Sequence, residues 1–503
     1  MKIMFFYSAF ENLGIEYLSA VLKKSGHETR LLFDPGLFND PFITISPLRS
    51  FFNFDQYLLD QAIAYAPDIF VFSATSSTYL NALQFAKKIK HLMGKKIVFG
   101  GIHPTSVPQD VIAEQAIDYV IVGEGEEVLT ELVDCLQAGK PVKGIGNLWF
   151  KEKEIIKNNS VRPLINDLDC LPFPDKDLYY RIIPEFKTGY TIITRRGCPN
   201  ICSYCYTSVL KKLYPQQPKV RIRSVNNVIE ELRYALAKYN FKRLRINDDL
   251  FTSDSQWLED FSQQYVKYIT RPVFCFVSPA HVNPAIVKNL KQIGCYQVCM
   301  GVQSVSQEVR ENILHRFHSN QQIENAIKLF RRFKIRCVVD NIIGLPGEQE
   351  ADLLAMLKFY NQNRPNRICV FKLIYFPQTD IAAIGLKAKV IDQEYMDTMA
   401  KQPNVAANTV HNRTEDKNKR LYHLLLIGLR FFPKRFIEFI IKRKLYLYIP
   451  LINPSLIETP LSMVARDRLD IVRRRYYTRY IKFSLKLILS KIRLFRNKKI
   501  LNN

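Results

Sequence analysis

The stretch YTIITRRGCPNICSYCY, residues 190–206, decides how this chain is interpreted. It opens with an apolar, β-branched run that predicts a strand. Three of the ten cysteines follow at once, Cys198, Cys202 and Cys205, with the spacing C-x3-C-x2-C. We therefore expect the three thiols in one loop just past the end of a strand. Three thiolates on so short a loop can hold three irons of a four-iron cluster and leave the fourth iron without a protein ligand.

Two other chemistries use closely spaced cysteines. Zinc usually takes four ligands from two paired knuckles, and the chain contains no second C-x-x-C. A disulfide suits an oxidising compartment, whereas the N-terminal MKIMFFYSAF lacks a cleavage site and predicts a first strand rather than a signal peptide. The spacing favours a cluster over zinc or a disulfide without excluding either.

The cysteine stretch resembles the signature of the radical S-adenosylmethionine (SAM) enzymes. That signature is C-x3-C-x2-C with an aromatic residue before the last cysteine, a place that Tyr204 fills. The resemblance implies a [4Fe-4S] cluster on Cys198, Cys202 and Cys205, whose open iron chelates the amino and carboxylate groups of SAM. It also implies an external electron donor, because reduction of the cluster cleaves SAM to methionine and a 5'-deoxyadenosyl radical.

A β/α series surrounds the cysteines between residues 190 and 390. Six strand-like runs alternate with helical ones, which predicts a partial (β/α)6 barrel with its active-site loops at the carboxyl ends of the strands. The strands are expected near 191–194, 243–247, 273–277, 297–302, 336–343 and 369–375, and helices include 225–239, 284–292, 320–333 and 348–361.

The loop after the second of these strands carries two adjacent carboxylates. By resemblance, Asp248 or Asp249 takes the ammonium group of SAM through a charge-assisted hydrogen bond. A helix N-cap or a solvated turn is the alternative role, and the sequence does not decide which aspartate acts.

Two further loops resemble SAM-binding elements of the same family. Gln303 and Ser304, in Gly301-Val302-Gln303-Ser304, match a motif that reaches the ribose. Gly344 and Pro346, in GLPGE at 344–348, match the element beside the adenine, where a close backbone approach to a flat ring is needed. Arg316 matches a family arginine more loosely.

Residues 1–145 show an earlier alternation of strands and helices, which predicts a doubly wound (Rossmann-like) parallel sheet. Strands are expected near 2–7, 69–73, 96–99 and 119–122, and helices near 14–25, 79–92, 107–115 and 126–136. Small and polar residues follow the strands, and in such a sheet that edge is where ligands bind. This segment resembles the cobalamin-binding domain of class B radical SAM enzymes. The resemblance implies cobalamin contacts from Ser73, Thr75, Gly100, Gly101, Gly123 and Glu124.

One part of the cobalamin fingerprint is missing. No Asp-x-His occurs in the chain, so the first loop supplies no histidine to the lower face of the cobalt. The glycines are expected to leave room for a nucleotide tail against the backbone. His103 is expected to be a packed loop histidine.

Two regions carry no catalytic pattern. Residues 146–189, with their prolines and aspartates, predict a linker. Residues 391–503 predict a mainly helical region in which the basic residues of a chain of net charge +25 concentrate. Within it, 421–499 mixes apolar and basic residues without the eighteen or so apolar residues that span a bilayer, which favours an interfacial helix on an anionic membrane. Helices packed over the open barrel are the alternative. Aromatics lie among aliphatics there, which argues against a nucleic-acid partner.

These observations lead to one main functional hypothesis. The chain is expected to be a cobalamin-dependent radical SAM enzyme, a methyltransferase that acts at an unactivated carbon of a small-molecule or lipid-like substrate. A cyclase or rearrangement enzyme without methyl transfer is the first alternative. A non-catalytic membrane- or RNA-binding protein of the same fold is the second, and the intact cysteines argue against it. We expect a cytoplasmic location, with peripheral contact at the inner face of the membrane, and assign no catalytic residue beyond the cofactor ligands.

Overall fold

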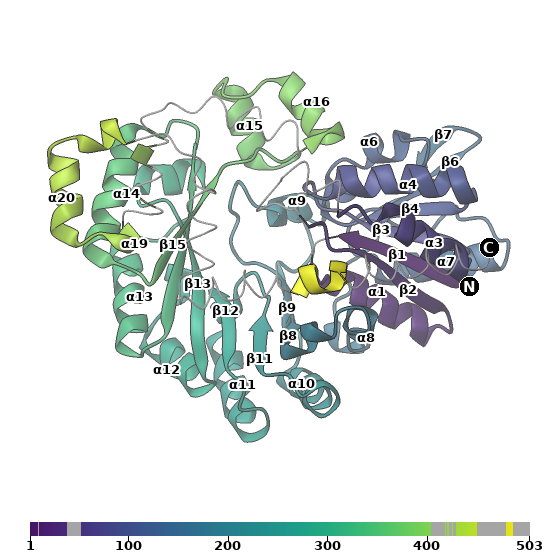
Figure 1. The fold of residues 1–503 in the computed structure, drawn as a ribbon, viewed down its shortest axis with the longest axis horizontal. Helices are drawn as coiled ribbons and strands as arrows, with labels where there is room; N and C mark the ends of the chain where they lie inside the picture. Colours follow the sequence, from purple (N-terminus) through teal and green to yellow (C-terminus); the bar gives the residue numbers. More distant parts are fainter. Residues whose placement is uncertain are drawn as a thin grey trace, which may run out of the picture.

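The computed structural model describes residues 1–8, 10–37, 52–403, 418, 420, 421, 425, 429–449 and 479–485. Two α/β bodies lie side by side in it, one built on each of two large sheets (Figure 1). The second body follows the first along the chain.

The first body contains a seven-stranded sheet. Its strands, in spatial order, are β2 (Glu28–Asp34), β1 (Lys2–Ser8), β3 (Ile69–Ser73), β4 (Lys96–Gly100), β5 (Tyr119–Ile121), β6 (Leu148–Glu152) and β7 (Ile155–Asn158). The first five are parallel, and β6 and β7 are antiparallel additions at one edge. In a parallel sheet of order 2-1-3-4-5, successive strands are added on one side of β1 and then on the other, so the strand order reverses between β1 and β3. Ligands bind beyond the carboxyl ends of the strands at this point.

Helices cover both faces of this sheet. One core lies under α1 (Leu13–Lys24) and α7 (Glu126–Gln137). The other lies under α3 (Asp55–Tyr65), α4 (Tyr79–Met93) and α6 (Pro108–Ala113), and α5 (Ile102–Ser106) precedes α6. The predicted doubly wound fold is confirmed.

The predicted linker over 146–189 needs correction at its start, because β6 and β7 belong to the first sheet. The residues of β7 are mostly exposed, so this strand has no apolar alternation that the sequence could reveal. The remainder holds only short elements, namely η1 (Leu168–Cys170), α8 (Asp177–Tyr180) and η2 (Pro184–Thr188).

The second body is an open, six-stranded parallel sheet. Its strands, in order from one edge to the other, are β8 (Gly189–Ile192), β11 (Arg243–Ile246), β12 (Val273–Val277), β13 (Cys295–Gln303), β14 (Arg336–Ile343) and β15 (Arg367–Lys372). The outer helices are α10 (Val225–Tyr239), α11 (Ser255–Tyr268), α12 (Pro284–Gln292), α13 (Asn320–Arg332) and α14 (Glu350–Asn363) (Figure 1). The strand order matches the chain order, as in a partial barrel, so the predicted (β/α)6 architecture is confirmed.

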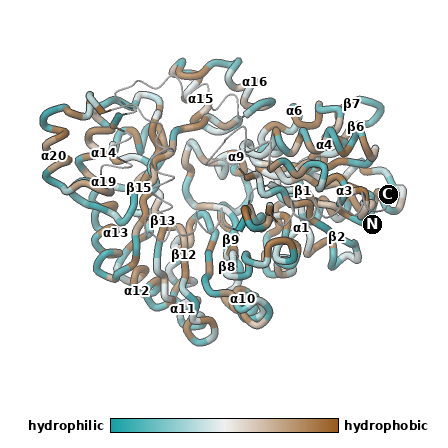
Figure 2. The backbone as a smooth tube through the Cα atoms, in the orientation of Figure 1, coloured by the Kyte–Doolittle hydropathy of each residue, from teal (hydrophilic) through white to brown (hydrophobic). Residues whose placement is uncertain are grey.

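Alternation along the barrel strands separates a core from an inner face. Leu244 and Ile246 of β11 enter the large core beneath the helices, whereas Arg243 and Arg245 of the same strand lie outside it. Figure 2, coloured by residue hydropathy, shows hydrophobic residues along the strands of both sheets and hydrophilic residues on the outer turns of the helices.

A small ladder and a helix connect the two bodies. The antiparallel strands β9 (Arg195–Gly197) and β10 (Val220–Ile222) flank the cysteine loop and α9 (Tyr206–Leu213), which lies toward the first body (Figure 1).

The described part of the C-terminal region is helical. It comprises α15 (Asp380–Lys387), α16 (Gln393–Lys401), α19 (Leu429–Phe431), α20 (Lys434–Lys442) and η7 (Leu445–Tyr448). Residues 479–485, yellow in Figure 1, lie between the two bodies, and the ring of Tyr480 packs 5.9 Å from Phe33 and 6.2 Å from Phe186. Most of the predicted interfacial segment 421–499 lies outside the described residues.

Candidate active site

The three signature cysteines lie in the loop between β9 and α9. Cys198 and Cys202 are buried, and Cys205, half-buried, precedes the first residue of α9. Two of the sulfurs have a hydrogen-bond donor close by in the chain. Asn200 Nδ2 lies 3.6 Å from Cys198 Sγ, and Thr207 Oγ1 lies 3.3 Å from Cys205 Sγ. Burial raises the pKa of Cys198, and the two neighbouring thiols raise it further, so the three sulfurs lie within electrostatic reach of one another.

The cysteine loop is held by its backbone. Gly197 has a φ of +91°, and an added Cβ would collide with the carbonyl of Lys219, the residue before β10. Ser203 N–H donates to the Leu314 carbonyl at 3.1 Å, and its hydroxyl donates to the Ile313 carbonyl at 2.5 Å. The loop is thereby tied to the segment that follows β13.

Arg316 has a larger role in the site than its loose sequence match predicted. Its Nη1 lies 3.3 Å from Cys202 Sγ and 3.3 Å from Tyr204 Oη, and its Nη2 donates to the Gly301 carbonyl at 2.6 Å. One buried cation thus joins the cysteine loop to the end of β13. A cation beside a ligating sulfur favours the thiolate, and Tyr204, the signature aromatic, orients toward the same group.

The structure separates the two aspartates. Asp248 is buried, and its carboxylate accepts hydrogen bonds from Thr194 N–H at 2.6 Å and from Thr194 Oγ1 at 2.5 Å. Arg195 Nε lies 3.3 Å from it. Because all these partners come from the chain itself, Asp248 anchors the end of β8 and has no free acceptor for a ligand.

Asp249 is the aspartate that faces the cysteines. It is accessible to solvent, and the surrounding protein raises the pKa of its carboxyl group by burial. Its charge raises the pKa of Cys198 and of Cys205. An ammonium group brought to the open side of the cysteines would therefore meet Asp249.

The two ribose residues also differ. Gln303 has a φ of +73°, and the register between β13 and β14 shifts there. A non-glycine residue in this conformation is strained, which is typical of ligand-contacting positions. Ser304 is buried, and its hydroxyl accepts from Ser306 N–H at 3.2 Å. Gln303 remains available to a ligand, whereas Ser304 shapes its own turn.

The predicted adenine element forms a turn after β14. Gly344 is exposed with a φ of +76°, and Pro346 is buried. The Gly344 N–H donates to Glu348 Oε2 at 2.7 Å. Burial raises the pKa of Glu348 to about 7, and its Oε1 is buried without a hydrogen-bond partner.

The loops after β3 and β4 of the first body join at its carboxyl edge. Gly100 O accepts from Ala74 N–H at 2.9 Å, and Ala74 O accepts from His103 N–H at 3.1 Å. Gly101 has a φ of +98°, and an added Cβ would lie 2.9 Å from the Ala74 carbonyl. Its lack of a side chain therefore permits the contact between the two loops, and its predicted role beside a nucleotide tail stays a prediction.

Hydroxyl groups remain at this edge for a polar ligand. Thr75 Oγ1 lies 3.0 Å from Ser77 Oγ and 3.1 Å from Thr78 Oγ1, and Ser73 is half-buried beside them. The predicted contact of Ser73 and Thr75 with a nucleotide tail stays a prediction.

Gly123 and Glu124 form part of the joint between the bodies. An added Cβ at Gly123 would collide with the hydroxyl of Tyr214. Glu124 accepts from Arg196 Nη1 at 2.7 Å and from Arg221 at 2.8–2.9 Å, and Arg196 also pairs with Glu126 at 2.6 Å. Both residues thus contact the segment that carries the cysteine loop, and their predicted cobalamin role stays a prediction.

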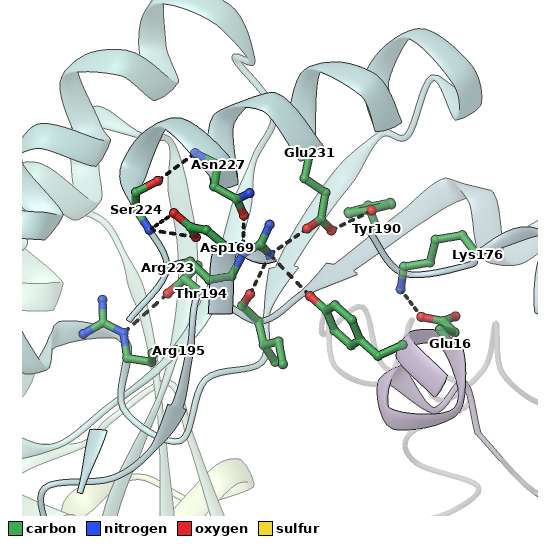
Figure 3. A network of polar contacts seen from close by, with 12 residues as sticks. Glu16, Asp169, Lys176, Tyr190, Thr194, Arg195, Arg223, Ser224, Asn227 and Glu231 are labelled. Carbon is green, nitrogen blue, oxygen red and sulfur yellow. Dashed lines mark hydrogen bonds and ion pairs between the residues drawn. The ribbon is translucent and has the colours of Figure 1, made fainter. Parts of the chain in front are cut away.

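Figure 3 shows a second polar joint, which includes Arg223, Glu231, Lys176 and Glu16. Arg223 pairs with Glu231 at 2.6 Å and lies 3.4 Å from Tyr17 Oη of α1. Nearby, Lys176 is fully buried and pairs with Glu16 of α1 at 2.7 Å and with Glu11 at 2.9 Å. The second joint is buried, whereas Glu124 and Arg196 of the first are half-buried. Both lie where polar side chains of the two bodies meet.

His103 is a packed histidine, as predicted. Its Nδ1 lies 3.1 Å from Ser76 Oγ, and its Nε2 lies 3.1 Å from the Ala400 carbonyl at the end of α16. Burial lowers its pKa to about 4. Both ring nitrogens are engaged, so this histidine has no free nitrogen for a cobalt ion.

The cysteine geometry fits a cluster better than a single ion. Among the described residues, no three His, Cys, Asp or Glu side chains converge closely enough to hold one metal ion. In a four-iron cluster each thiolate binds a different iron, so three separate sulfurs around one space are what is needed. The donors on each sulfur and Arg316 suit the charge of such a group.

Comparison with known proteins agrees with this geometry. The Radical SAM superfamily profile matches residues 192–360, and the B12 binding domain profile matches residues 6–133. An uncharacterised methyltransferase of Pyrococcus horikoshii is 30% identical over 354 residues, which cover 69% of this chain and 72% of that protein. The cytidylyl-2-hydroxyethylphosphonate methyltransferase of Streptomyces wedmorensis is 23% identical over 66% of this chain and 69% of its own length.

Among solved structures, the fold is similar to that of OxsB, a cobalamin-dependent SAM radical enzyme with aqua-cobalamin and SAM bound. The TM-score is 0.64 at 14% identity, over 99% of this chain and 81% of that chain. The chain belongs to the radical SAM superfamily, in the class that carries a B12-binding domain ahead of the radical SAM domain. Its cofactors are accordingly a [4Fe-4S] cluster, SAM and cobalamin, which confirms the predicted family and cofactors.

Proposed function

We propose that this chain is a cobalamin-dependent radical SAM methyltransferase that methylates an unactivated carbon of a small molecule. The observation that carries the proposal is the partly buried ion pair between Glu124 and Arg196, which ties the carboxyl edge of the B12-binding domain to the base of the cysteine loop. When bound, the cofactors supply a carbon radical on the substrate and a methyl group for it. Two relatives that align over two thirds or more of their lengths are named methyltransferases.

The chain's own residues would have distinct tasks. Cys198, Cys202 and Cys205 would hold the cluster, and Asp249 and Gln303 would orient SAM at its open iron. Arg316 would keep Cys202 and Tyr204 in position. Ser73 and Thr75 would hold the polar tail of cobalamin at the edge of the first sheet. A small-molecule substrate and an external reductant complete the reaction.

Product analysis tests the proposal. The anaerobically reconstituted full chain is incubated with SAM, cobalamin and a chemical reductant. Methyl transfer should yield S-adenosylhomocysteine together with 5'-deoxyadenosine. A radical cyclase or rearrangement enzyme would yield 5'-deoxyadenosine alone, which would refute methyl transfer.

Cysteine variants locate the cluster. Replacing Cys198, Cys202 and Cys205 together by alanine should remove about four irons per chain and abolish 5'-deoxyadenosine. Cys170→Ala is the matched control, because Cys170 is exposed and free. Loss of iron in the control, or its retention in the triple variant, would contradict the assigned ligands.

We further propose peripheral contact with an anionic membrane through α20 and its flanks. Ile437 and Ile440 are buried beneath the helix, whereas Phe436 and Phe439 are 41% and 51% exposed. Basic side chains accompany these aromatics, as suits an interfacial helix: they are Lys434, Arg435, Lys442, Arg443 and Lys444. No helix in the described ranges is long and apolar enough to cross a bilayer.

Vesicle flotation tests the membrane contact. The full chain should float with phosphatidylserine-containing vesicles and not with neutral phosphatidylcholine vesicles. Phe436→Ser with Phe439→Ser should weaken flotation several-fold, whereas Tyr234→Ser, which removes an exposed aromatic of α10, should not. Equal flotation of all variants would refute this surface.

A further inference from the structure

One arginine on the inner face of the barrel lacks a carboxylate partner. Arg245 lies on β11 between Leu244 and Ile246, which enter the core behind the sheet, so its side chain belongs to the opposite face. Its guanidinium carbon lies 5.1 Å from the ring centroid of Phe274 and 5.3 Å from that of Phe276. Nε donates to Asn247 Oδ1 at 3.0 Å. Within the described part of the chain, Arg245 forms no ion pair.

Two arginines at the domain joint are each paired with a carboxylate. Arg196 has Glu124 and Glu126, and Arg223 has Glu231, all within 2.6–2.7 Å. Arg245 remains exposed, yet surrounding protein lowers its pKa by burial. A guanidinium that stacks on aromatic rings and has no paired carboxylate keeps its fork free to bind an anion.

The surroundings place this arginine at the meeting point of the two domains. The charge of Glu11, in the loop after β1 of the B12-binding domain, reaches Arg245. Glu11 is already paired with Lys176 at 2.9 Å. Arg245 therefore lies within electrostatic reach of the first domain.

An apolar strip extends from Arg245 across the inner face. Phe274, Cys299 and Val338 form a small cluster there, on three successive strands. At its far side, the Cys299 thiol donates to Asp340 Oδ2 at 3.0 Å. The inner face thus offers a cation at one end, an apolar floor and a hydrogen-bonded carboxylate at the other end.

We propose that Arg245 binds an anionic group of the substrate, a carboxylate or a phosphate-type oxyanion, while an apolar part of the substrate lies over Phe274 and Phe276. The guanidinium fork matches either oxyanion with two parallel hydrogen bonds. That the bound anion is the molecule to be methylated rests on the proposed function, whereas anion binding itself does not. A charge-assisted contact of ordinary strength changes affinity by roughly tenfold or more.

Calorimetric titration of the anaerobically reconstituted full chain tests the assignment. The probes are phenylacetate, phenylphosphonate and the neutral phenylacetamide. The wild type should bind at least one anion roughly tenfold or more tighter than the amide, and the tighter anion identifies the oxyanion class. Arg245→Gln should remove the preference, and Arg245→Lys should retain part of it.

Arg233→Gln is the matched control. Arg233 also stacks on an aromatic ring, 5.0 Å from the Tyr268 centroid, but it lies exposed on α10 outside the barrel. This variant should keep the wild-type preference for the anion.

Three results would overturn the inference. The wild type could bind anion and amide equally, which needs no variant to observe. Arg245→Gln could keep the preference. It could instead lose SAM or corrinoid, which would make Arg245 a cofactor ligand. Titration requires no turnover, so a failure to form S-adenosylhomocysteine would refute the proposed function separately.

Discussion

Removal of the buried cation at the domain joint should destabilise the B12-binding domain strongly. Lys176 has a fully buried side chain and pairs with Glu16, also fully buried, and with Glu11. Burial opposes its charge, but the two carboxylates outweigh this effect and raise the pKa of Lys176. Lys176→Met leaves two carboxylates without a cation, and such a loss costs about 3–5 kcal/mol. For a domain of this size we expect the melting temperature to fall by roughly 10 °C.

Tryptophan fluorescence during urea unfolding measures this loss. The two tryptophans are Trp149 on β6 and Trp257 on α11, so a Trp257→Phe background reports the first domain alone. Lys23→Met is the control, because Lys23 is 41% exposed in its pair with Asp175 and such a pair contributes at most about 1 kcal/mol.

Two further observations sharpen this prediction. Burial raises the pKa of Glu16 against the opposing charge of Lys176. Without the lysine, protonation of Glu16 at low pH removes a buried charge, so the loss should be smaller at pH 5 than at pH 8. Adding Glu16→Gln to Lys176→Met should restore at least half of the stability. A loss below about 1 kcal/mol at pH 8, or one that does not vary with pH, would refute this account of the joint.

Four single variants give further expectations. Asp249→Asn should weaken equilibrium SAM binding about tenfold and leave the urea midpoint unchanged. Asp248→Asn should instead lower the free energy of unfolding by about 1–3 kcal/mol. The reverse pattern would show that the two aspartates have each other's role. His103 has a pKa of about 4 in the folded chain, compared with 6.5 for a free histidine. As the pH falls from 6.5 toward 4, the unfolded chain takes up a proton first, so stability should fall. His103→Gln should flatten this slope, measured as the urea midpoint at each pH. Glu348 has a pKa of about 7 in the folded chain, compared with 4.5 for a free glutamate. Stability should therefore fall as the pH rises from 4.5 through 7. Glu348→Gln should remove that fall, and an unchanged slope would count against the raised pKa.

Much of the fold could be predicted from local pattern. Strands Val273–Val277 and Arg336–Ile343 have the bounds that their apolar runs predict, because a parallel strand buried on both faces requires such a run. The edge strand Glu28–Asp34 and the ladder β9–β10 were missed. Charged residues interrupt these short elements, and their pairing partners are distant in the chain.

In the candidate site, too, some features could be predicted from local sequence and others depend on the tertiary structure. The sequence by itself determined that three thiols share one loop after a strand, since their spacing allows nothing more distant. Only the tertiary structure decided which aspartate faces those thiols, that Glu124 is taken by Arg196 and Arg221, and that Arg316 contacts Cys202. The physical reason is that spacing constrains neighbours along the chain. The partner of a charged side chain depends on what the other domain brings beside it, and desolvation then determines which charges must be paired.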